Sequence, residues 1–142
     1  MAAVEGNQNL TVRRATSSVC AVIAVVAWGV TLLVLGRNPA VADAVRTELG
    51  DAGVTGATAV ITAAVGLLLI TLVFRWAGSR VPTGFVAAYL IADVVVWILI
   101  GLLSVSVVRF ETGAGIMLIS GWVFAVPSIA ELALAHRSRQ AR

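Results

Sequence analysis

Residues 85–103 read FVAAYLIADVVVWILIGLL, an apolar run interrupted by one charged residue, Asp93. At about 1.5 Å per helical residue, the run approaches the ~30 Å thickness of the hydrocarbon core of a bilayer, so it predicts a transmembrane helix. A carboxylate at the centre of such a helix costs about 2.5–3.5 kcal/mol to insert. Asp93 is therefore the first candidate for a functional or packing role.

The composition of the whole chain agrees with this prediction. Of 142 residues, 60% are hydrophobic and only 12% are charged, and the mean hydropathy is +1.02. Soluble domains carry about 25% charged residues, so these values place the chain among membrane proteins and leave no length for a soluble domain. All ten basic residues are arginine, a bias that we interpret as typical of a GC-rich bacterial genome.

Four apolar stretches predict an all-α membrane protein, a four-transmembrane-helix bundle within residues 15–135. The expected spans cover about 15–36, 55–74, 83–105 and 112–135, and Pro127 is expected to kink the last of them. A polar N-terminal tail (1–14), expected to be disordered over most of its length, precedes the bundle, and a basic tail (136–142) follows it.

The loop between the first two spans carries signals of a helix of its own. Asn38 suits an N-cap, Pro39 suits the first helical position, and Gly50 is a plausible stop. Between them apolar residues recur every four positions: Val41, Val45 and Leu49. The pattern predicts a short amphipathic helix that lies on the membrane surface in the first extracytoplasmic loop.

The distribution of arginine predicts the orientation of the spans. With the N-terminus inside, seven arginines lie on inner segments and three on outer loops: Arg13, Arg14, Arg75, Arg80, Arg137, Arg139 and Arg142 against Arg37, Arg46 and Arg109. The positive-inside rule then favours a multi-pass protein of a bacterial inner (plasma) membrane with cytoplasmic N- and C-termini. The inner arginine clusters could also bind anionic lipid headgroups.

A cleaved signal peptide is the rival interpretation of the first apolar run. Ala40-Val41-Ala42 resembles an A-x-A cleavage site. The run is longer than the 7–15 residues of a signal-peptide core, and three further spans follow it. We therefore expect the first span to be retained.

The helical spacing of the third span gathers its polar and aromatic side chains. Tyr89, Asp93 and Trp97 lie four residues apart and share a face, which should point into the bundle because lipid offers a carboxylate no donor. Counting from the span ends places Thr62 and Ser128 within about two turns of Asp93. No arginine reaches this depth, so a protonated, hydrogen-bonded Asp93 is the least costly state.

Two interpretations of Asp93 remain open. In one, Asp93 forms a structural interhelical hydrogen bond to a neighbouring hydroxyl or indole, and its protonation state never changes. In the other, Asp93 is a functional site that binds and releases a proton or a cation. Glu131, near the inner end of the fourth span, is expected to pair with Arg75 or Arg80, or to form a relay with Tyr89 and Asp93.

Small residues on the second and fourth spans predict close helix packing. They recur at helical spacing that lets two backbones approach, and they are Ala59, Ala63, Gly66, Gly121 and Ala125. On otherwise featureless helices, such faces are typical of contacts with another membrane subunit or with a second copy.

Several kinds of chemistry are excluded by residue counts. Cys20 and His136 are the only residues of their types, so an intrachain disulfide and a cysteine- or histidine-based metal site cannot be built. No phosphate-binding glycine loop or nucleophile–base pair is present. We expect no enzyme activity, no cofactor, no metal and no nucleic-acid partner.

The sequence thus favours a small polytopic membrane protein, a non-catalytic subunit, accessory or interaction protein that packs through small-residue helix faces. The alternative is a small oligomeric proton- or cation-coupled transporter or channel that uses Asp93. In size and span count the chain resembles the small multidrug-resistance transporters, but their membrane acid lies in the first span, where this chain has none. Nothing is therefore carried over from that family.

Overall fold

The computed structural model describes residues 2–77, 82–108 and 113–141, and the regular structure in these ranges is entirely α-helical. Four helices follow one another along the chain: α1 (Ala2–Arg37), α2 (Pro39–Ala77), α3 (Thr83–Val108) and α4 (Gly113–Gln140). Each contains a stretch long and apolar enough to span a membrane. The prediction of an all-helical protein with four such helices is confirmed.

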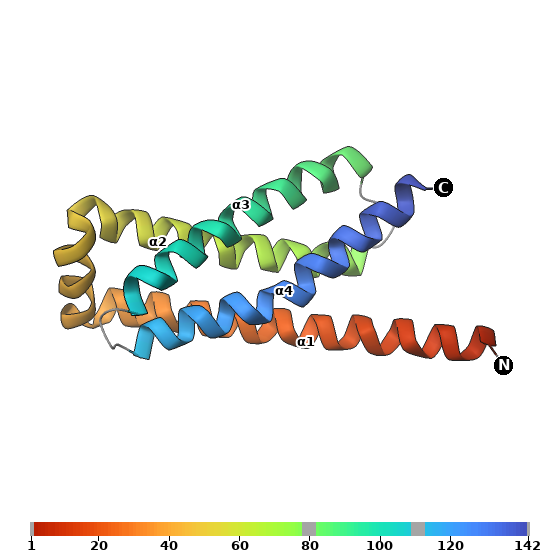
Figure 1. Cartoon of the computed structure of the whole chain (residues 1–142), viewed down its shortest axis with the longest axis horizontal. Helices are drawn as coiled ribbons and strands as arrows, with labels where there is room; N and C mark the ends of the chain where they lie inside the picture. The colour runs from red at the N-terminus through yellow and green to blue at the C-terminus, as the bar shows by residue number, and fades with distance from the viewer. Residues whose placement is uncertain (1, 78–81, 109–112, 142) are drawn as a thin grey trace.

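The four helices form an elongated bundle in which the chain direction alternates. Figure 1 shows both chain ends at one end of the bundle, here called the terminal end, and the junction between α1 and α2 at the other, the far end. α1 and α3 each pack against α2 and α4, and α2 and α4 approach each other, whereas in the described ranges the backbones of α1 and α3 stay more than 8 Å apart, as measured between Cα atoms. The helices therefore surround a central core in the order in which they occur in the sequence.

Each helix buries one stripe of residues spaced three or four apart, as a helix packed on one side must. On α1 the stripe includes Ala24, Trp28 and Leu35, and on α2 it includes Ala57, Ile61, Ala64 and Leu68. Large apolar side chains such as Ile91, Leu102 and Ile116 lie exposed on the outside. Since a soluble protein would bury them, this exterior suits lipid.

The N-terminal tail differs from its prediction. α1 is helical from Ala2, so the described part of the tail extends the first span as helix instead of being disordered. Residues 4–16 are exposed, and Figure 1 shows this part of α1 projecting beyond α2 and α3. At 36 residues, or about 54 Å, α1 is longer than the hydrocarbon core it would cross.

The start of α2 follows the helix signals in the sequence. The amide of Ala40 donates to Oδ1 of Asn38 at 3.1 Å, and Gly50 interrupts the helix with φ 75°, a value that favours glycine. The stretch before Gly50 crosses the far end of the bundle (Figure 1). Val41 and Val45 pack in the core, and the kink at Gly50 separates this stretch from the rest of α2. Its place on a membrane surface stays a prediction.

Some predicted features lie outside the described residues. Arg80, Arg109 and Arg142 belong to this group, although all three enter the arginine count that predicts the orientation.

Candidate functional site

Asp93 lies on the inner side of α3 and is 4% exposed. Its Oδ2 atom is enclosed and has no hydrogen-bond partner among the described residues. One helical turn towards the terminal end lies Tyr89, which is also buried, and one turn towards the far end lies Trp97, which is partly buried. Tyr89 and Trp97 are therefore the aromatic neighbours of Asp93 along this face of α3.

Tyr89 connects α3 to α2 rather than to either acid. Its hydroxyl lies 2.6 Å from the hydroxyl of Thr71 and also donates to the backbone carbonyl of Leu67. The tyrosine ring packs edge-on against Phe74, with ring centroids 5.0 Å apart. In this arrangement the Tyr89 hydroxyl is engaged by α2, so the hydrogen bonds of a relay from Glu131 through Tyr89 to Asp93 are not formed.

Trp97 connects α3 to α4. Its indole stacks on that of Trp122, with centroids 4.5 Å apart and an interplanar angle of 7°. The indole N–H of Trp97 donates to the carbonyl of Trp122, and the N–H of Trp122 donates to the carbonyl of Trp97, both at 3.1 Å. Both indoles are thus occupied by each other's backbone and neither donates to Asp93.

The hydroxyl groups expected near Asp93 also have other partners. Thr62 is exposed on the outside of α2, where it donates to the carbonyl of Thr58 at 2.7 Å. Ser128 is fully buried and lies 3.1 Å from Nη2 of Arg75. Thr62 does not face Asp93, because the rotation of α2 turns its side chain away from the core.

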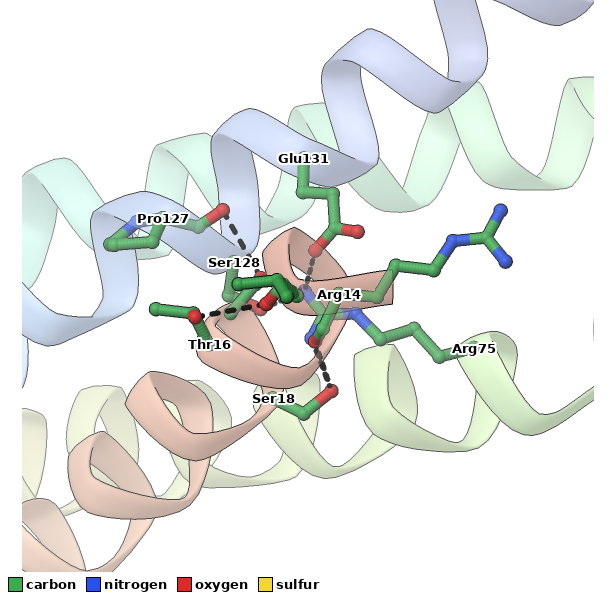
Figure 2. Close-up of polar contacts among 9 residues, drawn as sticks. Arg14, Thr16, Ser18, Arg75, Pro127, Ser128 and Glu131 are labelled. Atoms are coloured by element: carbon green, nitrogen blue, oxygen red, sulfur yellow. Dashed lines mark hydrogen bonds and ion pairs between the residues drawn. The ribbon is translucent and has the colours of Figure 1, made fainter. Parts of the chain in front are cut away.

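The largest polar cluster of the described residues is centred on Arg75, near the terminal end of α2. Figure 2 shows its guanidinium between α1 and α4. Nη1 donates to Ser18 at 2.9 Å, and Nη2 donates to Ser17 at 2.5 Å and to Ser128. The cluster therefore joins three helices through one side chain that can donate five hydrogen bonds.

Glu131 supplies the counter-charge to Arg75. Its Oε2 lies 3.1 Å from Nη2 of Arg75, and the two side chains are 17% and 16% exposed. The geometry is not that of a hydrogen bond, so the contact is ionic. The expected pairing of Glu131 with Arg75 is thus formed, whereas Arg80, the other expected partner, lies outside the described residues. Removing either member would leave a charge in a poorly solvated site, which is costly.

The predicted packing residues divide into two groups. Ala59 and Ala63 are exposed, and no atom lies within 4 Å of the position that a Cβ on Gly66 would occupy. Gly121 and Ala125, by contrast, are buried: a Cβ on Gly121 would lie 2.3 Å from Nε1 of Trp28. The small residues of α4 therefore serve packing within the chain, and only those of α2 face outwards.

Sequence reasoning missed Thr71, Ser17 and Ser18. Thr71 continues the buried stripe of α2 by three residues beyond Leu68, and this spacing is the signal that could have revealed it. Ser17 and Ser18 lie at the start of the first apolar run, where a hydroxyl gives no signal without knowledge of the facing helix. Within the described ranges no three His, Cys, Asp or Glu side chains are placed to hold a metal ion.

The comparisons with known proteins do not assign a family. No protein-family model, no curated protein and no solved structure matches the chain. Function must therefore be argued from the geometry of the site and of the bundle surface.

Proposed function

We propose that this protein is a non-catalytic accessory subunit of a membrane complex, and that the outward face of α2 packs against a transmembrane helix of another membrane protein. The observation that carries this proposal is the exposure of a continuous row of small residues on α2. This row, the α2 small-residue face, consists of the exposed residues Thr55, Gly56, Ala59, Thr62 and Ala63 and ends at the half-buried Gly66.

The chemistry of this face suits a helix better than lipid tails. Thr62 on this face and the adjacent Thr58 donate their hydroxyls to carbonyls of their own helix, at 2.7 and 2.9 Å, so these two hydroxyls do not need a partner in the membrane. Small residues allow two helix backbones to approach closely, and this packing drives helix association in membranes. The exposed sides of α3 and α4 instead carry large side chains such as Ile91 and Ile116.

The same proposal includes a location. We propose that the chain lies in the plasma membrane of a bacterium with both termini cytoplasmic. Residues 39–49 then lie at the extracytoplasmic surface of the plasma membrane. The arginine distribution and the positive-inside rule support this orientation. Labelling of Glu48→Cys but not Ser138→Cys by an impermeant thiol reagent in intact cells, in a Cys20→Ala background, is the expected result.

Site-directed crosslinking tests the proposed contact. In the Cys20→Ala background, Ala63→Cys places a thiol on the α2 small-residue face, and Ala92→Cys places one on the exposed surface of α3 as a matched control. We expect a crosslink from position 63 to a transmembrane segment of one defined protein and none from position 92. Ala59→Leu should abolish the crosslink at 63 while the helical content is retained.

Two outcomes would overturn the proposal. An adduct made of two copies of this chain would show self-association in place of an accessory role. Equal crosslinking from positions 63 and 92 would show that the α2 small-residue face has no preferred partner. Gly121→Leu is not a valid probe of a partner, because Gly121 contacts Trp28 within the chain.

A second function is favoured by one observation, the buried and unpartnered Oδ2 of Asp93. We propose as the alternative that Asp93 is the proton or cation site of a small oligomeric transporter. An ionisable side chain at membrane depth costs free energy to insert, and such side chains commonly mark proton or ion sites. Proton flux into liposomes that Asp93→Asn abolishes, while folding persists, is the expected result. Flux that is absent, or equal in wild type and Asp93→Asn, would exclude this role.

A further inference from the structure

The terminal end of the bundle contains a cavity of about 610 Å³ to which all four helices contribute. Phe74, Arg75 and Val86 line it from α2 and α3, and α1 and α4 supply the remaining walls. A volume of this size lies within the usual range for a site that holds a small organic ligand. The cavity is separate from the α2 small-residue face, so a ligand bound there would be independent of the proposed function.

The lining of the cavity has two chemical parts. One wall is apolar and includes Ala15, Phe74 and Leu132, while the polar part carries three guanidinium groups, those of Arg14, Arg75 and Arg139, against the single carboxylate of Glu131. Three positive charges against one negative charge favour an anion. Figure 2 shows the Arg14 side chain extending away from the polar cluster around Arg75.

A buried polar atom without a partner provides a second, independent observation. Nδ1 of His136 is enclosed and has no hydrogen-bond partner among the described residues, and His136 lines this cavity. A buried polar group that lacks a partner costs free energy, and a turn of the imidazole ring towards the cavity would let a bound ligand supply that partner.

We propose that this cavity binds the phosphate headgroup of an anionic membrane lipid. Arginine binds phosphate through paired N–H groups. Arg14 and Arg139 line the same space as Arg75, whose own Nη1 and Nη2 atoms are engaged within the chain. Arg14 and Arg75 flank the apolar parts of α1 and α2, which is the depth at which headgroups lie. The apolar wall would contact the first carbons of the acyl chains, a contact that free phosphate cannot make.

The chain offers matched controls for a test. Arg13 and Arg137 each lie within two residues of a lining arginine, are exposed, and are not among the residues that line the cavity. The double variants Arg14→Gln/Arg139→Gln and Arg13→Gln/Arg137→Gln therefore lose the same charge at neighbouring positions. A difference in lipid binding between the two double variants therefore reflects binding in the cavity and not the overall charge of this end of the bundle.

Binding is measured by native mass spectrometry on the full chain in neutral detergent titrated with phosphatidylglycerol, with phosphatidylcholine as the zwitterionic comparison. Neutral micelles lack the surface potential of an anionic bilayer, so only direct contacts contribute. We expect wild type to retain phosphatidylglycerol preferentially, Arg14→Gln/Arg139→Gln to bind it about tenfold or more weakly, and Arg13→Gln/Arg137→Gln to change by less than about twofold.

A second variant tests whether the lipid needs the space of the cavity, without changing the charge of its lining. Ala135→Phe keeps every arginine and fills part of the cavity from an exposed position, and it should also reduce retention. Equal losses in the two double variants, or full retention by Ala135→Phe, would overturn the proposal. If inorganic phosphate displaced the lipid at equal concentration, the site would bind free phosphate and not a lipid headgroup.

Discussion

Trp97 and Trp122 hold each other across the interface between α3 and α4 by two reciprocal hydrogen bonds and one stacked ring pair. Each indole N–H donates to the backbone carbonyl of the other residue at 3.1 Å, and the rings lie 4.5 Å apart. Interhelical hydrogen bonds in membranes contribute about 0.6 kcal/mol on average, and aromatic pairs add about 0.5–1.5 kcal/mol.

This relationship predicts non-additive effects of mutation. Trp97→Phe and Trp122→Phe should each lower the free energy of unfolding by about 1–2 kcal/mol. The double variant should cost less than the sum of the two, because the first substitution already disrupts part of the shared contact. Unfolding in mixed micelles with increasing denaturing detergent measures all three, and strict additivity would contradict the reciprocal pair.

Gly121 should tolerate an added methyl group poorly, because the indole of Trp28 occupies that space. A Cβ there would lie 2.3 Å from Nε1 of Trp28, compared with 3.0 Å between a Cβ on Gly101 and Nε1 of Trp122. We expect Gly121→Ala to cost about 1–3 kcal/mol through overpacking and Gly101→Ala to cost less. Gly29→Ala, which meets no atom within 4 Å, is the control and should be neutral or stabilising. Similar losses at 29 and 121 in thermal unfolding would count against this packing.

The hydroxyl of Tyr89 should contribute to stability without being essential. Tyr89→Phe removes its bonds to Thr71 and to the Leu67 carbonyl but keeps the ring against Phe74. Thr71 retains a bond to that carbonyl at 3.0 Å, so the expected cost is about 0.5–1.5 kcal/mol. An unchanged free energy of unfolding would show that this contact between α2 and α3 is not maintained.

The ion pair of Arg75 and Glu131 should behave as a coupled unit. Glu131→Gln leaves the guanidinium without a counter-charge and should cost about 1–3 kcal/mol. Arg75→Gln/Glu131→Gln should cost less than the sum of its single variants. Glu48→Gln, at an exposed site, serves as the control, with an expected change within about 0.5 kcal/mol. A Glu131→Gln variant as stable as this control would refute the coupling.

The number and type of the helices could be predicted because apolar run length is a property of each segment alone. The start of α2 at Asn38 and Pro39 and its break at Gly50 could be predicted for the same reason: capping and positive φ are local. The prediction that the polar tail is disordered was wrong, because α1 is helical from Ala2. This stretch is exposed and has no apolar periodicity, so its sequence carries no signal for a helix.

The partners of the candidate site residues could not be predicted in the same way. Depth counting places Thr62 near Asp93, but the rotation of α2 exposes Thr62 and directs Thr71 inwards. That rotation depends on how the buried stripes of all four helices fit together, which no single segment encodes. Gly121 and Ala59 illustrate the same difficulty: both are small, yet one receives Trp28 and the other faces outwards.

Pro127 divides α4 into two halves that are held by different contacts. Proline supplies no amide hydrogen to the carbonyl one turn earlier, so a helix bends there at low cost. The half before Pro127 is fastened by Trp28 and Trp97, while the half after it carries Leu132, His136 and other walls of the terminal cavity. This second half is held by Arg75, through Ser128 and Glu131, so the position of one cavity wall depends on the same guanidinium that lines the cavity.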